Sequence, residues 1–357
     1  MSRETKLHLN TQVLRGFNDL YGPAWHRDLE LINSLGMEDN HYPGAIPIPD
    51  LYRRLFNFAM EPRPVMIDTR AGLTTVDGQI AWVRNDTEAV MGIHSDSYNG
   101  ADNQFADWCI RNIEQVVDDT IQVSSAGLLK GGAVAWVQIQ RPENIITPEG
   151  VIIRPFIMAT TSYDGSIAST MMDGFVDTVC DNTRDAFLAG GGQRYRVKRT
   201  RNGRFNVSSA RDALGIINAN TEDYLAEIAA LNAAEVSDKQ WATFVETLCP
   251  IEDGATGRST TMAENKRSAL TGLWNTDTRV TPWRNTAWGA LQAVNTYTHH
   301  LATVRNMPRD ERNFLRVVEG KTTDGDRAAL AVLQTVLGRT IQVADRNPVS
   351  VSMATAA

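Results

Sequence analysis

The order of two hydrophobic periodicities constrains the fold of this 357-residue chain more than any other feature. Residues 133–140 and 151–161 are apolar, β-branched runs of strand length, separated by a proline-bearing loop. After Gly203 the pattern changes to helical spacing, which recurs in the segments 210–233, 238–248, 262–274, 286–304 and 324–337. Strands followed by helices predict an α+β fold, in which an antiparallel sheet with packed helices precedes a mainly helical C-terminal region.

The same change of pattern divides the chain into four segments. Residues 1–100 are rich in prolines and predict an irregular N-terminal region with short strands, such as 79–83. Residues 101–205 form the predicted α+β core, which ends in a basic strand. A helical region over 206–345 and a frayed tail over 346–357 follow.

Composition narrows the classes of function. The net charge of −7 gives no global signature of nucleic-acid binding, so such a site must be a local patch. The three cysteines are far apart and form no CxxC, which argues against a disulfide framework or a zinc site. The chain shows neither an apolar targeting segment nor a run of about 18 apolar residues. We therefore expect a cytoplasmic protein that contacts no membrane.

Nucleotide and metal motifs are missing from the sequence. It contains no GxxxxGK[ST], which argues against a P-loop nucleotide site, and no HExxH zinc motif. The adjacent pair His299 and His300 would point about 100° apart on a helix, so the two rings do not easily share one metal. The sequence thus predicts no cofactor.

The strongest chemical feature is the run GQRYRVKRTRNGR at residues 192–204, which is basic and free of acids. On a strand, Arg194, Arg196 and Lys198 would project to one face at a period of two. Such a row suits a phosphate backbone, although a basic edge strand can also serve only to prevent aggregation. We favour binding and add two basic residues of the strand region, so that the candidate nucleic-acid-binding residues are Lys130, Arg154, Arg194, Arg196, Lys198, Arg199, Arg201 and Arg204.

Two polar clusters precede the basic run. Asp164 and Gly165 suit a tight turn, and the Asp-Asn-Thr cluster at 181–183 suits the cap of a helix over 184–188. Cys180 is interpreted as a small buried residue, with a nucleophile as the alternative. The aspartates at 173, 177 and 181 would share one helix face and could hold a divalent metal, with a solvated face as the alternative.

Several stretches together resemble the phage/plasmid-like protein family, which is defined by a domain of unknown function (number nine hundred and thirty-two). The matching stretches are AGLLKGGAVAWVQIQ (126–140), TSYDGSIAS (161–169), DTVCDNTRDAFLA (177–189), YRVKRT (195–200) and TAWGALQAVNTYTHH (286–300). The family often has His where this chain has Tyr163, and Arg-His-Thr where it has Lys198-Arg199-Thr200. The resemblance implies a mobile-element context but no settled activity. A weaker, fold-level similarity links the chain to ring-forming single-strand annealing proteins.

These observations support three hypotheses. The first, which we favour, is a non-catalytic phage- or plasmid-type protein that binds single-stranded DNA and anneals complementary strands in recombination or replication. It would act as a homo-oligomer, with a ring as one form, and would have no catalytic residue. The second is a metal-dependent nucleic-acid-processing enzyme that uses Asp164 or the aspartates at 173, 177 and 181. The third is a structural or host-takeover protein that binds no nucleic acid.

Overall fold

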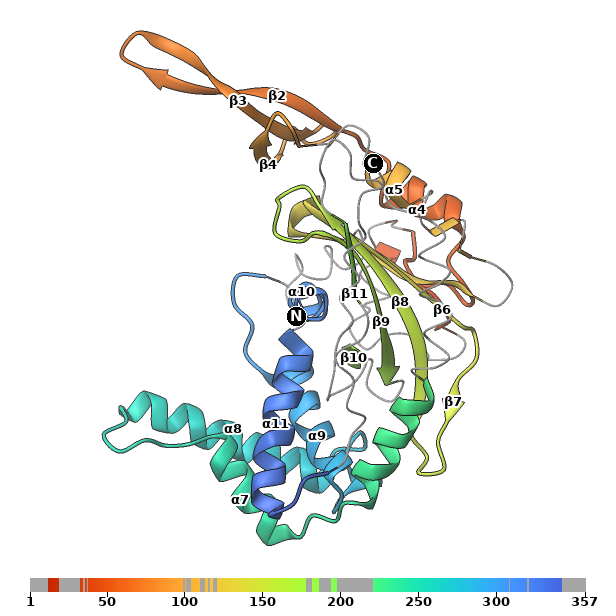
Figure 1. Cartoon of the computed structure of the whole chain (residues 1–357), viewed down its shortest axis with the longest axis vertical. Coiled ribbons are helices and arrows are strands. Elements are labelled where there is room, and N and C mark those ends of the chain that lie inside the picture. Colours follow the sequence, from red (N-terminus) through yellow and green to blue (C-terminus); the bar gives the residue numbers. More distant parts are fainter. Residues whose placement is uncertain are drawn as a thin grey trace, which may run out of the picture.

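The computed structural model has a β-rich N-terminal half and a mainly helical C-terminal half (Figure 1). It describes residues 12–18, 33–34, 36, 38–98, 100, 104–109, 113–114, 116–117, 121–177, 182–185, 194–197, 221–307, 309–319 and 321–341. All named strand pairs are antiparallel, and the helices follow the sheets along the chain. The fold class that the two periodicities predicted is therefore confirmed.

The main sheet has the strand order β1-β5-β6-β8-β9-β10, with β7 paired to β8 and β11 paired to β9. The two strands predicted from apolar runs are β6 and β8, and they are direct neighbours in this sheet. Hairpin turns connect β5 to β6 and β8 to β9 at the same end of the sheet. The strands are β1 (Val13–Arg15), β5 (Gln122–Leu129), β6 (Val134–Gln140), β7 (Ile145–Ile146), β8 (Ile152–Ser162), β9 (Ser169–Asp177), β10 (Asn182–Asp185) and β11 (Arg194–Val197).

The helices surround the main sheet and fill the C-terminal half (Figure 1). Those of the N-terminal half are α4 (Ile48–Arg54), α5 (Phe105–Cys109) and the short turn η3 (Lys130–Gly132). The C-terminal half holds a helical segment at 221–233, α7 (Asp238–Leu248), α8 (Gly257–Thr276), η4 (Thr281–Trp283), α9 (Ala287–Thr296), η5 (Tyr297–Leu301), α10 (Arg309–Glu319) and α11 (Lys321–Leu337). Within the described residues, none of these helices has the length and apolarity needed to cross a membrane.

Alternation along β6 and β8 divides the core between the two faces of the main sheet. Val137 and Ile157 belong to one face, where they pack into a cluster with residues of α4 and α5. Trp136 and Met158 belong to the other face, where they pack with Leu315 of α10. Because both faces are covered, β6 and β8 read as continuous apolar runs rather than as an alternating pattern.

A separate three-stranded sheet, β2-β3-β4, projects from the body as a long hairpin (Figure 1). We call it the arm; it consists of β2 (Met60–Thr69), β3 (Gly72–Arg84) and β4 (Val90–Ser95). These strands correct the expectation of an irregular region with short strands. Pro62 and Pro64 lie within β2 opposite Trp82 and Ile80 of β3, and β2 is an edge strand, where a proline removes no required ladder bond.

The stretch after the β8–β9 turn also differs from the expectation. The sequence predicted a helix at 184–188 capped by the Asp-Asn-Thr cluster, whereas residues 182–185 form β10 and pair with β9. Asp and Asn are turn formers as well as helix caps, so the local signal fits a hairpin equally well and pairing with β9 decides the outcome. Asp173 and Asp177 lie on strand β9, which places their Cα atoms about 13 Å apart. That separation removes the proposed shared metal site on a helix face.

Candidate functional site

The basic run begins as a strand at the edge of the main sheet. Arg194 pairs opposite Met172 and Arg196 opposite Thr170, both in β9. Within the described residues β9 is the partner of β11, so the strand prediction for this segment is confirmed over 194–197. Further across the sheet, Thr170 pairs with Thr160 and Thr160 pairs with Trp136, whose side chain packs on the face that α10 covers.

The remainder of the basic run lies outside the described residues. Lys198, Arg199, Arg201 and Arg204 belong to this undescribed part, and so does Cys180. Their roles remain those that the sequence predicts.

Arg154 is a correction to the candidate set. Its side chain is fully buried in β8, on the sheet face that also carries Met158. The guanidinium donates to the amide oxygen of Asn144 through Nε (3.1 Å) and through Nη2, and it lies 5.6 Å from the ring centroid of Phe17. A buried guanidinium cannot contact a phosphate backbone without unfolding its surroundings, so Arg154 acts in the core.

Lys130 lies in the turn between β5 and β6. The turn KGG is left-handed throughout, with φ of 53° at Lys130, 67° at Gly131 and 101° at Gly132. Glycine adopts this conformation without a Cβ penalty, whereas a lysine is strained in it. The turn directs the Lys130 ammonium onto the neighbouring β8–β9 turn, where it donates to Asp164 (3.0 Å) and to Ser166 (2.8 Å).

The Asp164-Gly165-Ser166 turn is the tight turn that the sequence predicted. Gly165 has φ of 72°, and the carboxylate of Asp164 accepts from the backbone N–H (2.9 Å) and the hydroxyl (2.6 Å) of Ser166. Burial alone would raise the pKa of Asp164, but hydrogen bonds from Ser166 and Lys130 outweigh it and hold this pKa below its ordinary value. The carboxylate is therefore ionised at neutral pH and satisfied by its neighbours.

This turn also anchors the arm to the main sheet. The backbone carbonyl of Tyr163 accepts from Nε2 of His94 in β4, and the His94 ring stacks on Tyr98 at 4.0 Å. The Tyr163 side chain is fully buried and donates to the carbonyl of Gly100 at 2.9 Å. Gly92 packs directly on the Tyr163 carbonyl, and a Cβ at this position would overlap it.

Arg84, at the end of β3, makes a second connection between the arm and the main sheet. It donates to the carbonyl of Gly131 (3.1 Å) and forms an ion pair with Asp86 (2.6 Å). Its guanidinium lies 3.7 Å from the ring centroid of Phe58, a cation–π contact. The hydrogen bond from Arg84 lowers the pKa of Asp86. We call the linked residues Arg84, His94, Lys130, Asp164 and Ser166 the turn cluster.

In the turn cluster the amino group of Lys130 lies between the carboxylate of Asp164 and the hydroxyl of Ser166, and both accept from it. In the described part of the chain no three His, Cys, Asp or Glu side chains group so as to hold a metal ion. His299 is buried and His300 is half-buried, at the end of the segment that contains α9. We therefore interpret the turn cluster as the joint that orients the arm.

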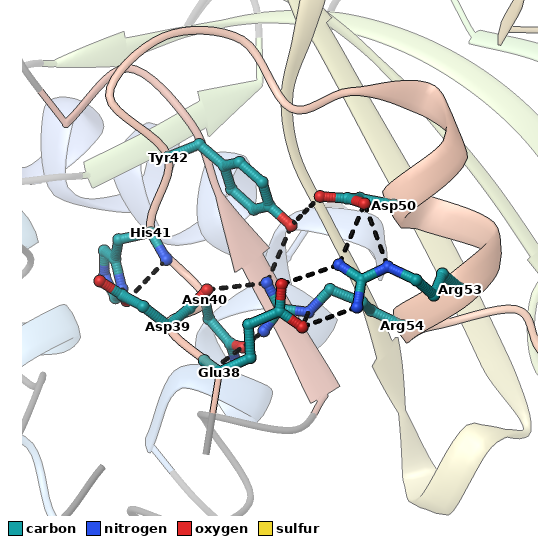
Figure 2. A network of polar contacts seen from close by, with 8 residues as sticks. All are labelled: Glu38, Asp39, Asn40, His41, Tyr42, Asp50, Arg53 and Arg54. Atoms are coloured by element: carbon teal, nitrogen blue, oxygen red, sulfur yellow. Dashed lines mark hydrogen bonds and ion pairs between the residues drawn. The ribbon is translucent and has the colours of Figure 1, made fainter. Parts of the chain in front are cut away.

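A further polar network fastens α4 to the segment at 38–42 (Figure 2). Arg53 forms two hydrogen bonds with the carboxylate of Glu38 (2.7 and 2.8 Å), and this contact lowers the pKa of Glu38. Arg54 donates to the hydroxyl of Tyr42 (2.8 Å), which in turn donates to Asp50 (2.7 Å). Sequence analysis missed this network, although an acidic pair at 38–39 and a basic pair at 53–54 were available as a signal.

The chain matches a known protein family. The family model described as a domain of unknown function, DUF932, matches residues 90–318, which is well over half of the chain. The matched range runs from β4 to α10 and includes the turn cluster apart from Arg84. No curated protein and no solved structure matches the chain.

Proposed function

Because the chain belongs to the DUF932 family, whose description assigns no activity, we propose a function from its own residues: single-stranded DNA binding along the β11 edge of the main sheet. The observation that carries this proposal is that the basic run begins as an edge strand, at Arg194–Val197. Alternate residues of a strand lie about 6.6 Å apart on one side, so successive cations form a row that a phosphate backbone can follow.

Binding of this kind suits strand annealing. A protein that grips phosphates and leaves base edges free lets two complementary strands meet without a hydrolysed cofactor. The basic run contains six cations within residues 194–204, in a chain whose net charge is −7. Such a local concentration of charge supports a dedicated anion site. In the phage or plasmid context that the resemblance implies, the protein would act in recombination or replication in the host cytoplasm, as a homo-oligomer.

Lys130 is expected to contribute less to phosphate binding than the basic run does. Its side chain is one-third exposed and already bonded to Asp164, so contact with a phosphate would have to share or replace that ion pair. Arg154 has no place in the proposal because it is buried. The proposed contact residues are therefore those of the basic run, and Lys130 contributes less than any of them.

The test is a binding titration with a fluorescently labelled single-stranded oligonucleotide, with and without Mg²⁺. The protein in which Arg194, Arg196 and Lys198 are all replaced by Ala should bind roughly tenfold more weakly or worse at moderate salt. A control with Arg70, Lys239 and Arg258 replaced by Ala removes the same charge from exposed positions elsewhere and should bind nearly as the wild type does.

Two outcomes would overturn the proposal. Equal affinity of the two triple variants would show that the basic run serves only to guard the sheet edge. Cleavage of the oligonucleotide in Mg²⁺ would instead favour the metal-dependent enzyme.

A further inference from the structure

The two outer strands of the arm differ in how well they are protected against pairing with a strand of another chain. β2 carries two prolines and three charged residues, Glu61, Arg63 and Asp68. Prolines and charges on an edge strand prevent it from pairing with another chain. β4, which reads Val-Met-Gly-Ile-His-Ser, has no proline and no Lys, Arg, Asp or Glu. The arm therefore has one edge that resists strand pairing, at β2, and one edge without such protection, at β4.

β4 is also exposed and apolar. Val90 is 59% exposed and Ile93 is 54% exposed. Within the described residues β4 pairs with β3 on one side only, which leaves its other edge without a strand partner. Gly92 and His94 pack one face of β4 against Tyr163 in the main sheet, and this contact fixes the position of the strand.

We infer that β4 is a self-association edge, at which two copies of this chain pair their β4 strands antiparallel about a two-fold axis. The product is one continuous six-stranded sheet in the order β2-β3-β4 of one copy followed by β4-β3-β2 of the other. The pairing leaves the proline-guarded β2 strands at the two outer ends of that sheet, where they stop further growth. The inference is independent of the proposed nucleic-acid binding.

The geometry and charge of β4 select a second copy as the partner. An antiparallel strand pair is self-complementary, since the donors and acceptors of one edge meet those of the same edge rotated by 180°. β4 carries no fixed charge, so its two copies meet without like-charge repulsion. Val90 and Ile93 pair with Val83 and Ala81 of β3, which share one face, so the irregularity in β4 places both apolar side chains on the same face of the strand. Both would lose exposed apolar surface on that face of the joined sheet.

Sedimentation velocity over a range of protein concentrations tests the inference, with Ile93→Lys and Val90→Lys as the variants. Both side chains are more than half exposed, so the monomer should fold normally. A lysine at either position should raise the dimer dissociation constant by about tenfold or more, because it adds one charge from each copy to the paired edge. Leu73→Lys is the matched control, since Leu73 is 69% exposed on β3 of the same arm but lies away from β4.

Amide hydrogen exchange gives a second readout. In the wild type, amides of residues 90–95 should exchange more slowly as protein concentration rises, whereas in Ile93→Lys their exchange should not depend on concentration. A wild type that stays monomeric at every concentration would overturn the inference. Self-association that Leu73→Lys abolishes but the β4 variants leave intact would overturn it too, because the contact would then lie at the tip of the arm.

Discussion

Lys130 and Asp164 form an ion pair of 3.0 Å that joins two hairpin turns at one end of the main sheet. The pair connects residues 34 positions apart in the sequence, and the hydroxyl of Ser166 completes it by donating to Asp164 and accepting from Lys130. The carbonyl of Tyr163, in the second turn, accepts a hydrogen bond from His94 of β4. The ion pair therefore also stabilises the contact between the arm and the main sheet. The contribution of this ion pair to the free energy of unfolding can be measured by substitution.

Asp164→Ala should lower the free energy of unfolding by about 1 to 2 kcal/mol at neutral pH, because it removes the acceptor of the bonds from Ser166 and Lys130. Urea denaturation followed by circular dichroism measures the change. Asp77→Ala is the matched control, since Asp77 is an exposed carboxylate in β3, and it should change stability by less than about 0.5 kcal/mol. Equal effects of the two substitutions would contradict a stabilising role for the ion pair.

The same residue predicts a dependence on pH. The pKa of Asp164 is lowered in the folded state, whereas in the unfolded chain it takes its ordinary value of about 4. Its charge therefore contributes full stability above about pH 4, and the contribution is lost as the pH falls through the lower folded-state pKa. The stability difference between the wild type and Asp164→Ala should narrow on acidification below pH 4. A difference that stays constant to pH 2 would show that turn geometry, rather than charge, accounts for the effect.

The turn cluster also shows what the sequence could predict. The strands at β6 and β8 and the helix α7 were predicted closely, because each has a strong periodicity and α7 begins with a capping box at Ser237. The Asp164-Gly165 turn was predicted from its residue types. Its partners were not, because Lys130 and His94 are remote in the sequence and only the pairing of distant strands brings them to the turn.

Charged side chains are usually exposed to solvent, but two arginines of this chain are not. Arg154 was predicted to bind nucleic acid, but it lies on a strand whose two faces are both covered, so its burial follows from the order of the strands in the sheet and not from its residue type. Arg312 lies in a mixed-charge segment that favours a solvated helix face. It is half-buried and donates to the carbonyl of Thr298, and desolvation lowers its pKa.

Arg154→Met should therefore act on stability. It keeps much of the apolar volume but removes the bonds to Asn144, and we expect a loss of about 1 to 3 kcal/mol in the free energy of unfolding. Among molecules that remain folded, the salt dependence of DNA binding should equal that of the wild type. A flatter salt dependence with unchanged stability would return Arg154 to the candidate nucleic-acid interface.

Two glycine substitutions should have opposite signs. Gly92→Ala places a methyl group against the Tyr163 carbonyl and should destabilise the protein by about 1 to 3 kcal/mol as the arm shifts on the main sheet. Gly272 lies inside α8 with open space around its Cβ position, so Gly272→Ala should stabilise by about 0.5 to 1 kcal/mol. Thermal unfolding of both variants in the same buffer measures the contrast. Equal melting temperatures for Gly92→Ala and the wild type would contradict close packing of β4 on the turn.

The salt dependence of DNA binding is the sharpest check on the basic run. If Arg194, Arg196 and Lys198 each neutralise one phosphate, the slope of log affinity against log salt should fall in magnitude by about 0.7 per residue replaced, or roughly 2 for the triple Ala variant. Fluorescence anisotropy between low and moderate salt measures this slope. The Arg70, Lys239 and Arg258 triple Ala control should keep the wild-type slope, because it lowers the net charge equally without touching the run. If both variants flatten the slope to the same extent, DNA affinity depends on the net charge of the protein and not on the particular residues at the β11 edge. If only the first does, the row of cations acts on one tract of phosphates.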